Sequence, residues 1–209
     1  MPGLFITFEG TEGAGKSTQI KLLAERLQSL GKQVRLLREP GSTPIGEEIR
    51  HTLQHSAQNQ AMNPEAELLL INASRAQLVR EVIRPALEAD EIVVCDRFYD
   101  STVAYQGYGR GLDLALVKAI IDFAVDGTRP QLTLFLHVPL SVSEERQAGR
   151  SAKPDRFEGA GRKFFERVEQ GFLAIAKAEP QRVKYIDATQ SIEVVQAQIW
   201  QHVQALVTW

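Results

Sequence analysis

The sequence contains one cysteine, Cys95, among 209 residues, and it has no long apolar run. A single thiol cannot form an intrachain disulfide or a cysteine zinc cluster, and this is typical of proteins in a reducing cytoplasm. No apolar stretch approaches the roughly 20 residues that a helix needs to span a bilayer, so no membrane association is predicted.

Neither sign of charge dominates, because 24 basic residues stand against 26 acidic ones and give a formal net charge of −2. This balance argues against a module that binds nucleic acid, which would need a basic surface. Apolar residues make up 44% of the chain and charged residues 24%, which is ordinary for a globular protein. We therefore expect one domain over residues 1–209 with a sizeable buried core.

A glycine-rich segment at residues 10–18 carries the strongest motif, G-x-x-x-x-G-K-[ST]. Glycines let successive backbone N–H groups curve around an anion, and the helix that follows directs its N-terminal dipole to the same place. Lys16 would neutralise the outer phosphates, and the Ser17 hydroxyl would suit Mg²⁺. The predicted ATP site comprises Gly10, Thr11, Glu12, Gly13, Ala14, Gly15, Lys16, Ser17 and Thr18.

Apolar patterning predicts strands that alternate with helices along the whole chain. Strands are expected at residues 4–8, 33–37, 91–95, 131–138 and 182–186. Helices are expected at residues 19–30, 45–55, 64–87, 98–108, 112–125, 162–178 and 191–207, with another from residue 141. In the helix at 64–87, Asn63 is expected to be the N-cap, and Pro85 is expected to kink the helix or to end it near residue 87. This alternation predicts an α/β fold: a doubly wound, five-stranded parallel sheet with helices on both faces. Ligands of such sheets bind beyond the C-terminal ends of the strands.

Two charged residues, Asp96 and Arg97, follow the buried strand at 91–95. In phosphate-loop enzymes an acidic residue at this place orients Mg²⁺, although an aspartate here could also cap the next helix. Arg97 could pair with Asp96 or bind a phosphate, and its position at the ligand edge of the sheet favours the phosphate.

A basic segment lies between the expected helices near residues 146 and 162, with Arg146, Arg150, Lys153 and Arg156. Runs of like charge are often only a solvated surface. In a chain that binds phosphate, however, the segment at about 146–160 is predicted to be a lid that brings Arg150 to the transferring phosphoryl group.

Taken together, several motifs resemble those of the bacterial thymidylate kinases over essentially the whole chain. They are Phe8-Glu9-Gly10, Arg38-Glu39-Pro40-Gly41, Asp96-Arg97, Ala104-Tyr105-Gln106-Gly107 and Asp155-Arg156-Phe157. The resemblance implies the P-loop kinase fold and transfer of the γ-phosphoryl group of ATP to dTMP with Mg²⁺. The product, dTDP, would feed dTTP synthesis. The family also implies a homodimer.

The resemblance further implies roles for individual residues. Lys16, Arg97 and Arg150 would be catalytic, while Ser17 and Asp96 would hold the metal. The acceptor nucleotide would contact Glu12, Arg38, Glu39, Pro40, Ile71, Arg75, Arg97, Thr102, Tyr105 and Gln106. Glu12 would reach its 3′-hydroxyl, Thr102 and Gln106 would hydrogen-bond thymine, and Tyr105 would disfavour ribonucleotides.

One position departs from the family pattern. Relatives usually have a phenylalanine four residues before Arg75, where this chain has Ile71. An aliphatic side chain loses the aromatic geometry contribution of about 0.5–1.5 kcal/mol, so either the pocket compensates or the base tolerance is broader.

The phosphate loop by itself leaves three other functions open. A different small-molecule or nucleotide kinase would share the loop, and a panel of acceptors would distinguish it. The second is a nucleotide-operated switch or motor. A guanine-specific switch would carry an Asn-Lys-x-Asp motif, which this sequence lacks, and a switch would hydrolyse its nucleotide slowly without an acceptor. A nucleic-acid-binding module is disfavoured by the near-neutral charge.

Overall fold

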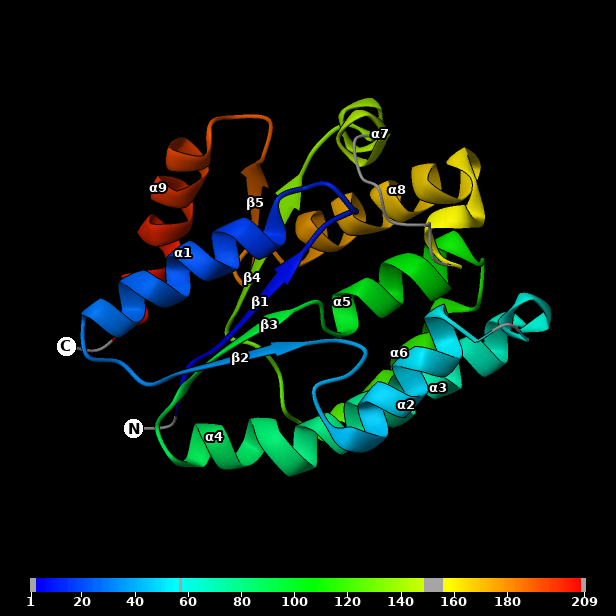
Figure 1. Ribbon diagram of the computed structural model, residues 1–209, viewed down its shortest axis with the longest axis horizontal. Helices are drawn as coiled ribbons and strands as arrows, with labels where there is room; N and C mark the ends of the chain where they lie inside the picture. The colour runs from blue at the N-terminus through cyan, green and yellow to red at the C-terminus, as the bar shows by residue number, and fades with distance from the viewer. Residues whose placement is uncertain (1–2, 57, 149–155, 208–209) are drawn as a thin grey trace.

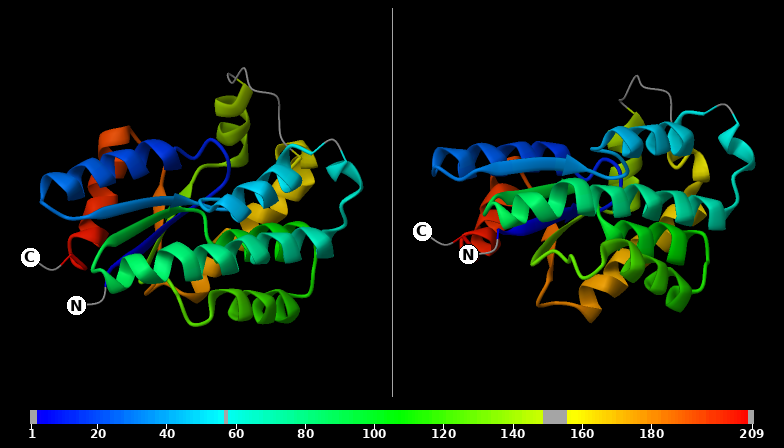
Figure 2. Two further views of the ribbon diagram at one scale, coloured as in Figure 1. Left: turned by 60° about the horizontal axis from the view of Figure 1, so that its bottom comes forward. Right: turned by 90° about the horizontal axis from the view of Figure 1, so that it is seen from below.

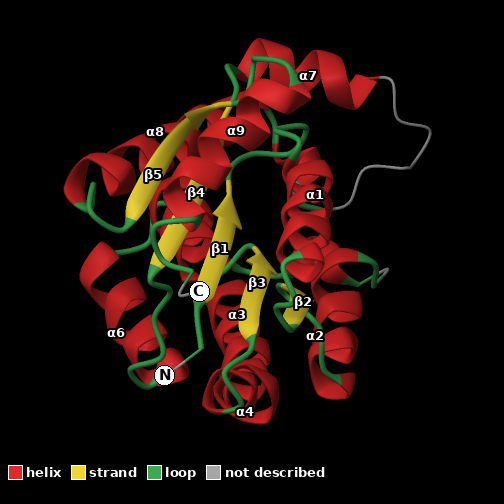
Figure 3. Cartoon of the chain, turned by 90° about the vertical axis from the view of Figure 1, so that its left-hand side faces the viewer, coloured by secondary structure: helices red, strands yellow, loops and turns green. Residues whose placement is uncertain are grey.

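The computed structural model describes residues 3–56, 58–148 and 156–207. Within these residues five strands form one parallel sheet in the order β2-β3-β1-β4-β5, which can be followed in Figure 3. The strands are β1 (Phe5–Glu9), β2 (Val34–Arg38), β3 (Ile92–Asp96), β4 (Leu132–His137) and β5 (Val183–Asp187). The predicted α/β fold with a five-stranded parallel sheet is confirmed.

Helices cover both faces of this sheet (Figure 1). The α-helices are α1 (Lys16–Ser29), α2 (Pro44–Gln54), α3 (Pro64–Leu78), α4 (Arg84–Glu88), α5 (Tyr99–Thr102), α6 (Leu114–Val125), α7 (Leu140–Ala148), α8 (Arg162–Ala178) and α9 (Ile192–Val203). Wider π-helical turns, η2 (Val79–Ile83) and η3 (Val103–Gly109), continue α3 and α5, and short 3₁₀ turns lie at η1 (Asn59–Ala61) and η4 (Glu158–Ala160). None of these described helices is long and apolar enough to cross a membrane.

Strand side chains alternate between two cores because successive residues of a strand face opposite sides of the sheet. Ile6 and Phe8 of β1 pack with apolar residues of α1 and α9 on one face. Phe5 faces the other side, where it joins residues of α3, η2 and α6. A third apolar cluster is formed by Phe135 of β4 and residues of α8. Burial on both faces explains the nearly unbroken apolar run of β3.

Most element boundaries agree with the sequence to within a few residues, and the differences have local causes. The first helix begins at Lys16 rather than at residue 19, because Gly15 (φ 87°) ends the loop directly before it. Asn63 caps α3 as expected, with its Oδ1 accepting from Ala66 N at 2.8 Å. Pro85 was expected to kink this helix or to end it near residue 87. The helix widens into η2 just before the proline and ends at Glu88.

The C-terminal ends of three neighbouring strands bring the candidate residues together. Arg38 at the end of β2 is in register with Asp96 at the end of β3, and Glu39 N donates to Asp96 O at 3.0 Å. Arg97 N donates to Phe8 O of β1 at 2.9 Å, directly before the glycine-rich loop. Helices α2 and α3 pack against each other beside this edge (Figure 2), so residues of both can reach the same space.

Candidate functional site

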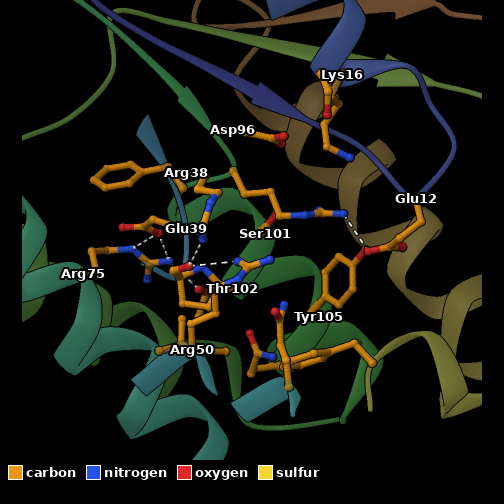
Figure 4. A pocket seen from close by; sticks show the side chains of 18 of the residues that line it. Glu12, Lys16, Arg38, Glu39, Arg50, Arg75, Asp96, Ser101, Thr102 and Tyr105 are labelled. Atoms are coloured by element: carbon orange, nitrogen blue, oxygen red, sulfur yellow. Dashed lines mark hydrogen bonds and ion pairs between the residues drawn. The ribbon is translucent and has the colours of Figure 1, made fainter. Parts of the chain in front are cut away.

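A cavity of about 370 Å³ lies at this edge of the sheet. Most of the residues predicted from the sequence line it: Glu12, Gly13, Gly15, Lys16, Ser17, Thr18, Arg38, Glu39, Pro40, Ile71, Arg75, Asp96, Arg97, Thr102, Tyr105 and Gln106. Gly10, Thr11 and Ala14 complete the loop without lining the cavity, and Arg150 lies outside the described residues. Figure 4 shows Lys16 and Asp96 on one side of the cavity and Glu39 and Arg75 on another, with Glu12 and Tyr105 on a third.

The glycine-rich loop has the backbone that its sequence predicts. Gly10, Gly13 and Gly15 all have positive φ, at 134°, 76° and 87°. A Cβ on Gly10 would lie 2.2 Å from the carbonyl oxygen of Leu136, so no larger residue fits there. Lys16 Nζ donates to Gly10 O and to Thr11 O, each at 3.0 Å, and these bonds hold its ammonium inside the loop. Burial and the neighbouring Arg97 lower the pKa of Lys16 to about 8.

A second cation, Arg97, lies across from the loop. Arg97 Nη2 contacts Glu12 Oε1 at 2.7 Å, and the Tyr105 hydroxyl donates to the same carboxylate at 2.9 Å. Although burial favours the neutral acid, the charges of Arg97 and Lys16 keep the pKa of Glu12 below its ordinary value. The backbone of Arg97 is left-handed (φ 68°), which is uncommon for a side chain of this size. The result is a charged pair that joins the phosphate loop to the end of β3, with Tyr105 of η3 bonded to the same carboxylate.

The far side of the cavity contains a buried ion pair. Arg75 is 1% exposed, and its Nε and Nη2 donate to Glu39 Oε2 at 2.9 and 2.7 Å. Nη2 also donates to Thr102 Oγ1 at 2.9 Å, and Nη1 donates to Asn72 Oδ1 at 2.9 Å. Burial raises the pKa of Glu39, and the contacts with Arg75 oppose that rise. Hydrogen bonds on several sides fix the guanidinium, so this end of the cavity is rigid and polar.

Comparison with known proteins identifies the family. A model of the thymidylate kinase family matches residues 8–199. The chain is 52% identical to a thymidylate kinase of Pseudomonas fluorescens over 94% of this chain and 92% of that protein. It is 48% identical to one of Syntrophotalea carbinolica over 94% and 93% of the two chains. The chain belongs to the thymidylate kinase family. The crystal structure of the Ehrlichia chaffeensis thymidylate kinase is also similar, with a TM-score of 0.79, 35% identity and coverage of 98% and 99% of the two chains.

The donor set for a metal agrees with what a member of the thymidylate kinase family would need for Mg²⁺. Asp96 Oδ1 is buried and has no hydrogen-bond partner among the described residues, and the Ser17 side chain lines the same cavity. Mg²⁺ prefers oxygen ligands and keeps several waters, so two protein oxygens can suffice when phosphate supplies the rest. No cluster of three or more carboxylate, histidine or cysteine ligands occurs in the described part of the chain. Asp96 and Ser17 therefore fit a metal that arrives with the nucleotide.

Several residues at or near the cavity were not predicted as site residues from the sequence. They are Arg50, Gln54, Phe98, Ser101 and Phe157, and just beyond the lining lie Glu9 and Glu67. Arg50 donates from α2 to Pro40 O at 2.9 Å, a contact that no local pattern signals. A signal did exist for Glu9, because a carboxyl within a short apolar strand must find partners or be neutral.

Glu9 is fully buried at the end of β1, and its carboxyl group contacts the residues that follow Arg97. Its Oε1 accepts from Phe98 N at 2.7 Å, and its Oε2 accepts from the Ser101 hydroxyl at 2.5 Å. Burial and the nearby Asp100 raise the pKa of Glu9 to about 8. Asp100 is itself paired with Arg182, whose Nη1 donates to Oδ2 at 2.7 Å and whose Nη2 donates to Oδ1 at 2.8 Å.

This raised pKa predicts a pH-dependent stability. Between the ordinary pKa of 4.5 and about 8, the folded chain holds a proton on Glu9 that the unfolded chain has lost. The free energy of unfolding should therefore fall as pH rises through this window. Glu9→Gln keeps an acceptor for Phe98 N but does not titrate, so its Tm should fall less than that of the wild type between pH 5 and 8. The difference should be at least about 3 °C, since 1 kcal/mol shifts Tm by about 2–4 °C in a chain of this size.

Thermal denaturation of the ligand-free proteins, followed by circular dichroism, measures this difference. Glu25→Gln, which removes a carboxylate from the exposed side of α1, serves as the control and should follow the wild type. Parallel Tm curves for wild type and Glu9→Gln would show that Glu9 is ionised in the folded protein.

Proposed function

We propose that the chain transfers the γ-phosphoryl group of ATP to dTMP and releases dTDP and ADP. The observation that carries this proposal is that the phosphate loop and the buried Arg75–Glu39 pair line the same cavity. The first group suits a triphosphate and the second suits the polar edge of a base, so two nucleotides can meet without a covalent intermediate. Membership of the thymidylate kinase family supports dTMP as the acceptor.

Phosphoryl transfer leaves the protein mainly the work of positioning and charge neutralisation. On ATP binding, Lys16 exchanges its two loop carbonyls for phosphate oxygens, and the loop N–H groups bind the rest of the triphosphate. Arg97 and Arg38 orient the acceptor phosphate for in-line attack. No general base is required, because a phosphate monoester is already ionised near pH 7. Ser17 and Asp96 would hold Mg²⁺, which would help to neutralise the charge of the transferring group.

The sugar of the acceptor lies, in this proposal, beside the hydrogen-bonded pair of Glu12 and Tyr105. Glu12 accepts a hydrogen bond from the 3′-hydroxyl, for which its carboxylate is already fixed by Arg97 and Tyr105. The Tyr105 ring, held edge-on by Phe164 and Phe172, fills the space next to the 2′-position. A deoxyribose is therefore preferred over a ribose.

A coupled assay of ADP release tests the function. With MgATP, we expect efficient turnover of dTMP, weaker turnover of dUMP, and negligible turnover of UMP and GMP. Failure to phosphorylate any of these would refute the proposed transfer to dTMP. Faster turnover of UMP or GMP than of dTMP would assign a different acceptor to the same site.

The segment at about 146–160 is proposed to act as a lid that contributes Arg150 to catalysis, within a single domain of residues 1–209. The loop at 11–14 holds no arginine, so a cation from elsewhere must stabilise the transferring group. Arg150→Ala should lower kcat by about 10³-fold, the lower end of what such an arginine contributes. The KM for dTMP should change little, and steady-state kinetics would measure both. Arg162→Ala removes an exposed arginine of α8 and provides the control; equal rates for the two variants would remove Arg150 from the mechanism.

We also propose that the protein is a cytoplasmic homodimer. Large apolar side chains are exposed on α3 and α6, two helices that pack against each other: Leu69 at 58%, Leu114 at 44%, Leu116 at 52% and Phe123 at 81%. A second copy would bury this surface through a two-fold contact of the same helices. The cytoplasmic location agrees with the use of ATP and with Cys95 being a buried free thiol.

Phe123→Asp should convert the dimer into a monomer, because it places a charge in the middle of the apolar contact. Size-exclusion chromatography with light scattering would measure the mass. Leu30→Asp, at the end of α1 on the opposite face, is the control and should leave the mass unchanged. A wild-type chain that elutes as a monomer at micromolar concentration would refute the dimer.

A further inference from the structure

Glu67 is a fully buried carboxylate behind the cavity, and its own exposed side-chain fraction is 0%. It lies on α3, one turn before Ile71 and two turns before Arg75, so all three project from the same side of the helix. A buried carboxylate is costly unless charged or hydrogen-bonding groups meet it. The described residues supply three such groups, and all come from segments far away in the sequence.

The partners of Glu67 are one amide and two guanidinium groups. Gln106 Nε2 donates to Oε1 at 2.7 Å. Arg110 donates from Nε to Oε1 at 3.2 Å and from Nη2 to Oε2 at 3.0 Å. Arg156, which lies within the segment predicted to be a lid, contacts Oε2 through Nη2. Three side chains therefore fix the carboxylate of Glu67, and the carboxylate in turn fixes the position of the Gln106 amide.

This contact decides which way the Gln106 amide faces. A carboxylate paired with two arginines only accepts hydrogen bonds, so the amide nitrogen must point toward Glu67 and the amide oxygen must point away from it. Over the described ranges, every hydrogen bond of the Gln106 side chain is made by Nε2, and Gln106 lines the cavity. The group offered to a ligand is therefore Oε1, an acceptor.

The neighbouring groups offer donors. Arg75 has five N–H bonds, of which two are used on Glu39, one on Thr102 and one on Asn72, as far as the described residues show. One N–H at Nη1 remains. The Thr102 hydroxyl accepts from Arg75, so its own proton can be donated. Together with Gln106 Oε1, this end of the cavity presents two donors beside one acceptor.

Thymine matches this arrangement, because its O4 accepts and its N3–H donates. Cytosine has the opposite pattern, with an amino donor at C4 and an acceptor at N3. We propose that Glu67 is a positioning residue for base choice: it holds the Gln106 amide oxygen toward the cavity, so that thymine is accepted and cytosine is rejected. This inference rests on the proposed function, in which Gln106, Thr102 and Arg75 hydrogen-bond the base.

The test compares kcat/KM for dTMP and dCMP in the wild type and in Glu67→Gln. The glutamine retains an acceptor for the arginines but can also donate, which frees the Gln106 amide to turn. The ratio of dTMP to dCMP efficiency should fall at least about tenfold, mainly through a lower KM for dCMP. General damage to the fold would lower both efficiencies together and leave the ratio unchanged. Glu65→Gln, an exposed change two residues earlier on α3, should behave as the wild type.

Glu67→Asp provides a second variant in case the first does not fold, since it keeps the charge but withdraws the carboxylate from Gln106 by one methylene. It should lower the same ratio. An unchanged ratio in the folded variants would overturn the role of Glu67.

Gln106→Leu separates this outcome from failure of the proposed site. It should raise the KM for dTMP and reduce the ratio. If it changes neither, Gln106 does not contact the base, and both the site assignment and the inference fall. If it changes both while the Glu67 variants change nothing, the site assignment stands and only the inference falls.

Discussion

The arrangement of this site depends on the neutralisation of buried positive charge. Five cationic side chains, those of Lys16, Arg38, Arg50, Arg75 and Arg97, line one cavity of about 370 Å³. Without a phosphate they would repel one another in a region that water only partly screens. The chain places a carboxylate or carbonyl group against each of them, so that the folded protein can exist before its ligands bind. The nature of each counter-group then determines what its cation can do.

The counter-groups fall into two kinds. Among the described residues, Lys16 Nζ donates its hydrogen bonds to the carbonyl oxygens of residues 10 and 11, which are weak partners that an anionic phosphate can replace. Arg75 is instead locked by Glu39, with both side chains no more than 3% exposed. Removing either partner of such a pair would leave an uncompensated buried charge, so this pair persists when ligands bind. In the proposed function, the exchangeable partners lie where the phosphoryl group is transferred, and the permanent pair lies where the base binds.

The sequence predicted those features that depend on local order. The glycine loop, the strand that precedes it and the cap at Asn63 are each specified within a few residues, and all three occur as expected. The contacts of Glu67 and Arg50 depend on segments separated by up to 89 positions, and no spacing in the sequence identifies them. The left-handed backbone of Arg97 was also not predictable, because it is imposed by the contacts of β1 and α5 around it rather than by arginine itself.

Ile71 shows how these two kinds of information combine. The sequence raised the question of whether an aliphatic residue at this place broadens base tolerance. Ile71 is 8% exposed and belongs to a cluster that includes Tyr105 and Phe157, so the apolar area that a ring can cover is still present. What is missing is the geometric preference of stacked rings, about 0.5–1.5 kcal/mol.

An apolar wall without that preference distinguishes poorly between thymine and cytosine, which have similar area. Discrimination must then come from the hydrogen-bonding edge, and there a misplaced donor or acceptor costs about 1–3 kcal/mol. In the proposed site, the rigid polar end of the cavity would therefore have a larger share in base choice than it would opposite an aromatic ring.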